Sequence, residues 1–127
     1  MKLTPINAPD SPSPAGGYSQ AIEVCDGQRL LFVSGQIPER ANGEVPEDFR
    51  SQAKVVWSHV LAQLGCARMS VANLVKVTIF LSSREHALAN REVRQEVLGS
   101  NEPALTVIIT GIFDEKWLLE IEAIAVA

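Results

Sequence analysis

The sequence predicts a single α+β domain in which two helices pack on one face of a mixed sheet. Two long segments carry apolar residues at helical spacing, and they alternate with shorter segments of β-branched and aromatic residues. The chain has 127 residues, the usual size of one domain, so we expect residues 1–127 to form one unit. Hydrophobic residues make up 46% of it and charged residues 20%, which is typical of a globular protein with its own core.

The N-terminal third should contain two paired strands. Residues 1–17 are rich in Pro, Ser, Gly and Ala, so we expect them to be extended and only loosely structured. Ala21–Cys25 has the pattern of a strand, residues 26–27 (Asp-Gly) are a hairpin signal, and residues 29–34 should be the return strand. Within that strand the apolar run LLFV favours coverage on both faces.

Two helices are expected farther along the chain. Residues 49–64 should form the first, with Asp48 as N-cap, Gly65 just past its end, and an apolar face made by Phe49, Ala53, Val56, Val60 and Leu64. Residues 83–98 should form a second, more polar helix that Ser83 caps and Gly99 ends, with Leu88, Val93 and Val97 as a narrow apolar stripe. Its arginines, Arg84, Arg91 and Arg94, alternate with glutamates, so we interpret them as a solvated face.

The remaining strands are residues 74–81, 105–110 and 118–126, which gives the order β-β-α-β-α-β-β. These strands hold more apolar surface than two helices can cover, so we expect the chain to oligomerise. In the last strand Glu120 and Glu122 point the same way. They either face solvent or lie in a cleft, where a carboxylate could move a proton or activate water.

Charge and motifs exclude several classes of function. The net charge of −4 disfavours nucleic-acid binding. No segment has the apolar length of a signal peptide or membrane span, so we expect a soluble, cytoplasmic protein. Cys25 and Cys66 should be free thiols. No metal or cofactor motif is present, so no cofactor is expected, and His59 and His86 should be structural.

Four segments together resemble the RidA/YjgF family, also called L-PSP endoribonuclease-like proteins. They are AGGYSQAIEV, LLFVSGQIP, ANLVKVTIFLSS and LLEIEAIAVA, which occur in the family's order from Ala15 to the C-terminus. The resemblance implies a chorismate-mutase-like fold and a homotrimer around a central β-barrel. It also implies small-molecule clefts between neighbouring subunits, which agrees with the exposed sheet face expected above.

Active members of that family hydrolyse reactive enamines and imines to keto acids and ammonia. The resemblance implies that Glu120 positions water, and that Tyr18, the segment Ser34, Gly35 and Gln36, and Asn90 bind the ligand. The family's arginine, which grips the substrate carboxylate, is absent, because Leu105 stands in the motif Pro-Ala-Leu-Thr. Arg40 or an arginine of a neighbouring subunit could substitute for it.

Three functions therefore remain open. The chain could be an imine or enamine hydrolase whose activity on 2-imino acids is weakened or lost, because Leu105 cannot donate charge-assisted hydrogen bonds to a carboxylate. It could instead be a non-catalytic trimer that binds a small ligand or a protein partner. Endoribonuclease activity is the weakest alternative, because the chain is acidic and has no interleaved basic and aromatic surface.

Overall fold

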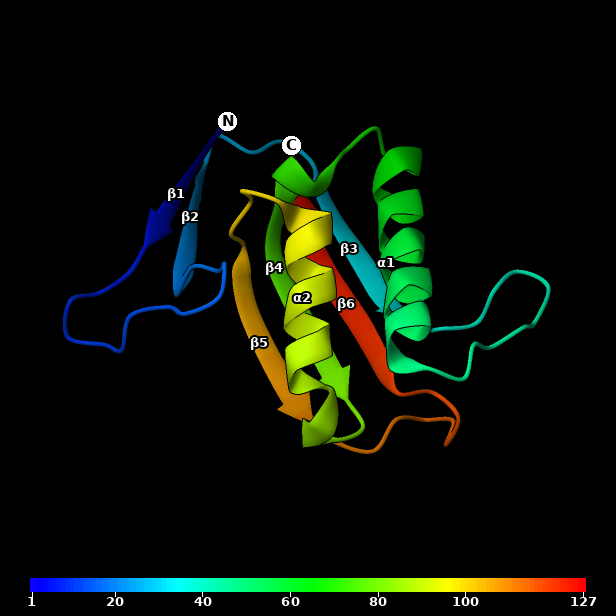
Figure 1. The fold of residues 1–127 in the computed structure, drawn as a ribbon. Helices are drawn as coiled ribbons and strands as arrows, with labels where there is room; N and C mark the ends of the chain where they lie inside the picture. The colour runs from blue at the N-terminus through cyan, green and yellow to red at the C-terminus, as the bar shows by residue number, and fades with distance from the viewer.

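The computed structural model describes residues 1–127 and has a four-stranded main sheet. In spatial order its strands are β3 (Leu30–Gln36), β6 (Leu119–Val126), β4 (Leu74–Leu81) and β5 (Ala104–Ile109). The β4–β5 pair is parallel and the other two pairs are antiparallel. Two helices, α1 (Phe49–Cys66) and α2 (Ala87–Leu98), lie over the same face of the sheet (Figure 1). The predicted α+β class with both helices on one face is confirmed.

Alternation along the strands divides the sheet into a helix-covered face and an open face. In β6 the side chains of Leu119, Ile121, Ala123 and Ala125 are buried beneath the helices, and the residues between them point the other way. Directly paired residues share a face, so Phe80, Glu120 and Ile108 lie together on the open face. This face also carries Phe32, which is 70% exposed.

Helix α1 forms as its apolar spacing predicts. All five expected core residues, from Phe49 to Leu64, are buried, and the Asp48 carboxylate accepts a hydrogen bond from the Ser51 amide at 2.9 Å. The prediction for Gly65 is wrong, because this residue lies inside the last turn. The chain leaves the helix at Arg68 instead, which has a φ of 57° and an amide that donates to the Gly65 carbonyl at 2.9 Å.

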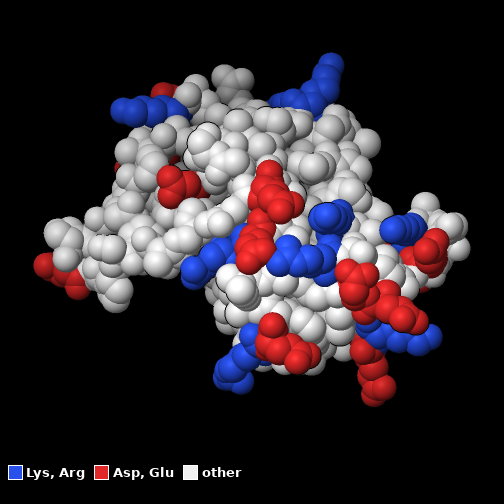
Figure 2. Space-filling model, viewed as in Figure 1, with Lys and Arg blue, Asp and Glu red and all other residues white.

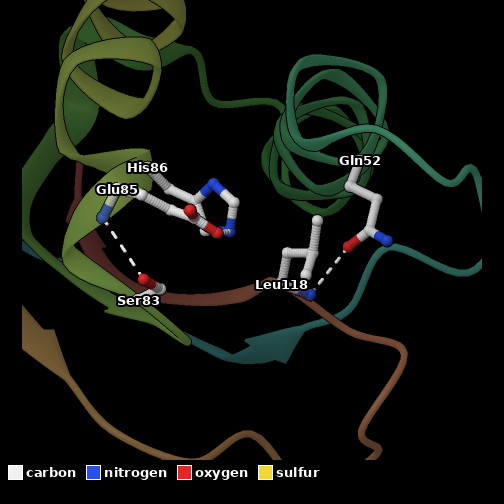
Figure 3. Close-up of polar contacts among 5 residues, drawn as sticks. All are labelled: Gln52, Ser83, Glu85, His86 and Leu118. Atoms are coloured by element: carbon white, nitrogen blue, oxygen red, sulfur yellow. Dashed lines mark hydrogen bonds and ion pairs between the residues drawn. The ribbon is translucent and has the colours of Figure 1, made fainter.

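Gln52 is a polar residue of α1 but is only 1% exposed. Its Nε2 donates to the carbonyls of Pro46 and Lys116 at 2.7 and 2.9 Å, and its Oε1 accepts from the Leu118 amide at 2.8 Å. Figure 3 shows Gln52 reaching from the helix toward Leu118. The side chain is buried because it satisfies three backbone groups that would otherwise lack partners.

The second helical segment begins with a 3₁₀ turn, η2 (Arg84–His86), before α2 starts at Ala87. Ser83 caps this turn by accepting from the Glu85 amide at 3.3 Å (Figure 3). Gly99, with a φ of 58°, ends α2 as expected. The apolar stripe is narrower than predicted, because Val93 is buried whereas Leu88 is 67% exposed.

The N-terminal residues are more ordered than their composition suggests. Strand β1 (Lys2–Ile6) pairs antiparallel with β2 (Ala21–Cys25) in a separate two-stranded sheet, which lies to one side of the main sheet in Figure 1. A loosely structured start is therefore wrong for residues 2–6. The partner that orders them follows a long loop, so local composition could not reveal the pairing.

The expected hairpin between β2 and β3 does not form. The chain turns at Asp26, which has a φ of 59°, but β3 pairs with β6, from Leu30↔Val126 to Gln36↔Ile121. β3 is an edge strand, and the helices cover only one of its faces. Leu30 on the other face is 65% exposed, so the prediction that both faces of this strand are covered is wrong for the single chain. None of the helices combines the length and the apolar character needed to cross a membrane.

Candidate functional site

A cleft of about 310 Å³ opens between α2, β5 and the N-terminal segment 15–18. We call it the α2–β5 cleft. Three predicted ligand-binding residues, Tyr18, Asn90 and Leu105, line it together, although they are far apart in the sequence. The complete lining is Ala15, Tyr18, Ala87, Asn90, Arg91, Arg94, Leu105 and Val107.

The backbone beside β5 places Tyr18. The Ser19 hydroxyl donates to the Glu102 carbonyl at 2.6 Å, and the Ser19 amide donates to the Pro103 carbonyl at 3.1 Å. Ser19 is buried and forms an isolated parallel bridge with Ala104. These bonds hold the segment against the start of β5, and the adjacent Tyr18 lines the cleft.

Leu105 lies in β5 opposite Val77, a residue of the core, and therefore points to the helix-covered face. Its side chain lines the cleft, together with that of Val107 two positions later. The isobutyl and isopropyl groups form an apolar wall that offers a ligand no hydrogen bond. Leu105 thus lines the α2–β5 cleft together with Tyr18 and Asn90.

Asn90 and Arg94 lie one helical turn apart on α2, and each is only 3% exposed. One terminal amino group of Arg94 donates to the Gly16 carbonyl. Arg94 Nε and Asn90 Oδ1 are buried without any hydrogen-bond partner in the chain. Native proteins satisfy nearly all buried polar atoms, so two orphaned atoms on adjacent turns mark an incomplete site.

Arg91 is the second guanidinium of the cleft. It lies so close to Gly16 that a Cβ on this glycine would be 2.9 Å from Arg91 Nε. Neither Arg91 nor Arg94 is paired with a carboxylate, since the ion pairs are Arg50–Glu92 and the contact between Glu85 and His86. Burial, reinforced by the neighbouring Arg91 charge, lowers the pKa of Arg94, and Tyr18 opposes part of this effect.

The interpretation of these arginines as a solvated helix face is wrong for Arg94. The helix turns Arg94 and Asn90 together toward the N-terminal segment, which covers them. The spacing in the sequence does indicate that the two side chains lie together, because Arg94 follows Asn90 by four positions and residues four apart share a helix face. The alternation with glutamates concealed it.

Glu120, the expected catalytic carboxylate, lies outside this cleft. It is half-buried on the open face, and its Oε1 would be 2.1 Å from a Cβ at Gly35. Glu122 shares the face and is exposed, so the expectation that both carboxylates point the same way is confirmed. Because Leu105 points to the opposite face, one chain does not bring Glu120 and Leu105 to the same small molecule.

Ser34 and Gln36, two further predicted ligand-binding residues, lie on the edge strand β3, outside the α2–β5 cleft. They line a second hollow of about 470 Å³ beside α1, and Gln36 Nε2 donates to the Ser34 carbonyl at 2.8 Å. β3 and β5 are the two outer strands of the main sheet. The predicted site residues are therefore distributed over two edges and two faces of the domain.

The other candidate residues have structural surroundings. His59 Nε2 lies 2.7 Å from the Glu39 carbonyl, and the His86 ring stacks on Phe49 with centroids 4.6 Å apart. Both cysteines are exposed and free, and no cluster of three potential ligands could hold a metal ion. Figure 2 shows basic and acidic side chains intermingled over the helix-bearing face, without a broad basic tract.

Comparison with known proteins places these features in one family. A family model described as endoribonuclease L-PSP matches residues 8–127. The RutC family protein PH0854 of Pyrococcus horikoshii is 34% identical over 118 residues, which cover 91% of each chain. TdcF of Escherichia coli K12, which carries the provisional name reactive intermediate deaminase, is 29% identical over 125 residues and 95% of each chain.

Solved structures give the same result. The Rid family protein YyfB of Yersinia pestis superposes with a TM-score of 0.85 over 100% of both chains at 25% identity. RidA from an Antarctic Psychrobacter superposes with a TM-score of 0.73, at 26% identity, over 98% of this chain and 99% of its own.

Proposed function

Because the chain belongs to the endoribonuclease L-PSP family, which includes the Rid proteins, we propose that it hydrolyses a small imine or enamine. In this reaction water adds to the imine carbon, the C–N bond breaks, and a carbonyl compound and ammonia leave. The single observation that carries the proposal is the α2–β5 cleft, which unites Tyr18, Asn90 and Leu105. The similarity to TdcF supports the same class of chemistry.

Leu105 sets the expected substrate preference. The arginine that the family uses at this position would donate two charge-assisted hydrogen bonds to a carboxylate, each worth about 1.5–3 kcal/mol. Leu105 donates none and presents an apolar surface instead. We therefore expect turnover of 2-imino acids to be orders of magnitude below that of an arginine-bearing relative.

Glu120 is proposed to position water, and a second copy of the chain is proposed to complete the site. Glu120 and Leu105 face opposite sides of the sheet within one chain, so both can act on one ligand only across a subunit boundary. The open face supports such an assembly, because Phe32 and Ile108 are 70% and 42% exposed there. A homotrimer with intersubunit clefts meets this requirement.

Leu105 also favours a second candidate, a trimer that binds its ligand without catalysis. The description of the matching family model, endoribonuclease L-PSP, names a third candidate, RNA cleavage. A net charge of −4 and the mixed charges of Figure 2 disfavour binding to a phosphate backbone.

Ammonia release from 2-aminoacrylate, generated in situ, tests the proposal. We expect slow release above the buffer rate by the wild type, a gain for Leu105→Arg, and loss in both backgrounds on Glu120→Gln. Wild-type turnover equal to that of an arginine-bearing relative would contradict the role of Leu105. No release by either the wild type or Leu105→Arg would favour the non-catalytic trimer.

A further inference from the structure

The α2–β5 cleft contains two guanidinium groups that no carboxylate of the chain neutralises. We propose that Arg91 and Arg94 form an oxyanion site that anchors the carboxylate of a small acid. The assignment of that acid as a substrate rests on the proposed function, whereas its binding does not. The site would hold the carboxylate from α2, so it does not replace the anchor missing at Leu105, and the slow turnover expected of 2-imino acids still applies.

Electrostatics supports an anionic ligand. The chain carries 15 acidic and 11 basic residues, yet both charged side chains of this cleft are positive. Arg94 is almost entirely buried, and the other charged side chain that lines the cleft, Arg91, is also a cation. Burying a charge without a counter-ion is unfavourable, so a bound carboxylate would relieve both the desolvation and the repulsion.

The orphaned atoms define the ligand's hydrogen-bonding groups. Arg94 Nε lacks an acceptor and Asn90 Oδ1 lacks a donor. A carboxylate supplies the acceptor and matches the planar fork of a guanidinium. An N–H or O–H group on the same molecule would supply the donor for Asn90, so the expected ligand is a small acid with an amino, imino or hydroxyl group.

Gly16 holds both guanidinium groups in place. Its carbonyl accepts from Arg94, and a Cβ at this position would be 2.9 Å from Arg91 Nε, so only glycine leaves room for that guanidinium. Its φ of 96° is a conformation that residues with a Cβ rarely adopt. The N-terminal segment therefore positions the two arginines before any ligand arrives, which reduces the entropy lost on binding.

The opposite wall and the size of the cleft limit the rest of the ligand. Leu105 and Val107 of β5 provide the apolar part of the lining, and Arg91 and Arg94 of α2 provide the charged part. A volume of about 310 Å³ is at the small end of the range for small-molecule sites. We therefore infer a compact amphipathic acid with its charge toward α2 and its uncharged end toward β5.

Calorimetric titration of the full-length protein tests this site with three probes: pyruvate, methyl pyruvate and inorganic phosphate. We expect pyruvate to bind at least about tenfold more tightly than its uncharged ester, and Arg91→Gln to remove this preference. Arg84→Gln is the matched control, because it removes the same charge from an exposed position outside the cleft. It should leave the affinity for pyruvate unchanged.

Arg94→Lys keeps the positive charge but loses the guanidinium fork, so we expect it to weaken pyruvate binding as well. Arg91 is exposed, so Arg91→Gln should fold and tests the oxyanion site even if Arg94→Lys, at a buried position, prevents folding. Equal affinities of the wild type and Arg91→Gln for pyruvate would overturn the proposal. Tighter binding of phosphate than of pyruvate would overturn the choice of a carboxylate.

Pyruvate binding and ammonia release, measured on the same variants, distinguish the oxyanion site from the proposed hydrolase activity. Arg91-dependent pyruvate binding without ammonia release would support the oxyanion site and contradict the hydrolase. Ammonia release from 2-aminoacrylate at equal rates by the wild type and Arg91→Gln, together with equal pyruvate binding, would support the hydrolase and overturn the oxyanion site.

Discussion

The carboxylate of Glu120 occupies the space beside the Gly35 backbone where any other residue would place its Cβ. A Cβ at Gly35 would be 2.1 Å from Glu120 Oε1 and 2.8 Å from Cδ. The absence of a side chain at Gly35 therefore determines where the carboxylate lies on the open face.

Gly35→Ala should displace this carboxylate while leaving the fold intact. The obstructing atoms are the end of a flexible, half-buried side chain, so the free energy of unfolding should change by less than about 1 kcal/mol. If Glu120 positions water, ammonia release should fall by about tenfold or more. Gly111→Ala is the control, because nothing lies within 4 Å of its Cβ position. Equal rates for both variants would remove Glu120 from the mechanism.

Gly65→Ala should stabilise the protein. Gly65 lies within the last turn of α1, where a Cβ would contact nothing within 4 Å, and alanine favours the helix by about 0.5–1 kcal/mol. Gly99→Ala should have the opposite effect, because Gly99 has a φ of 58°. Thermal unfolding of both variants measures the difference. Destabilisation by Gly65→Ala would show that α1 ends earlier than described.

The sequence predicts the elements whose patterns are local. The apolar spacing of α1 and the β-branched run of β4 appear with their expected residues, and Asp48 and Gly99 mark helix ends as expected. Each of these signals depends on neighbours within one or two turns, so the residues themselves contain the information.

Features that depend on distant partners cannot be predicted from local patterns. β1 is ordered by β2, and β3 pairs with β6 instead of its sequence neighbour. Likewise, the burial of Arg94 depends on the Gly16 carbonyl. Local composition predicts a loose tail for residues 1–17, a hairpin between β2 and β3, and a solvated helix face at Arg94. These predictions fail because the segments that pair with or cover these residues lie far away in the chain.

Gln52→Leu should destabilise the fold despite conserving much of the side-chain volume. Leucine removes the partners of the Pro46 and Lys116 carbonyls and of the Leu118 amide. A buried group without a partner costs about 1–3 kcal/mol, so we expect a loss of at least about 2 kcal/mol in urea unfolding. Gln63→Leu is a suitable control, since its Nε2 makes only an exposed 3.4 Å contact with Gln36. Equal midpoints for the two variants would contradict a structural role for Gln52.

Asp48 should make stability depend on pH at the acidic end. The Ser51 amide, followed by the Ser51 side chain, lowers the pKa of Asp48 below 3.8 in the folded protein. A lowered pKa means that the carboxylate stabilises the fold above the unfolded pKa, and that this contribution disappears as the pH falls through the folded value. Asp48→Asn keeps a capping oxygen but does not titrate, so wild type and variant should differ in melting temperature at pH 7 and converge toward pH 3. A difference that stays constant over this range would show that the charge of Asp48 contributes nothing to the cap.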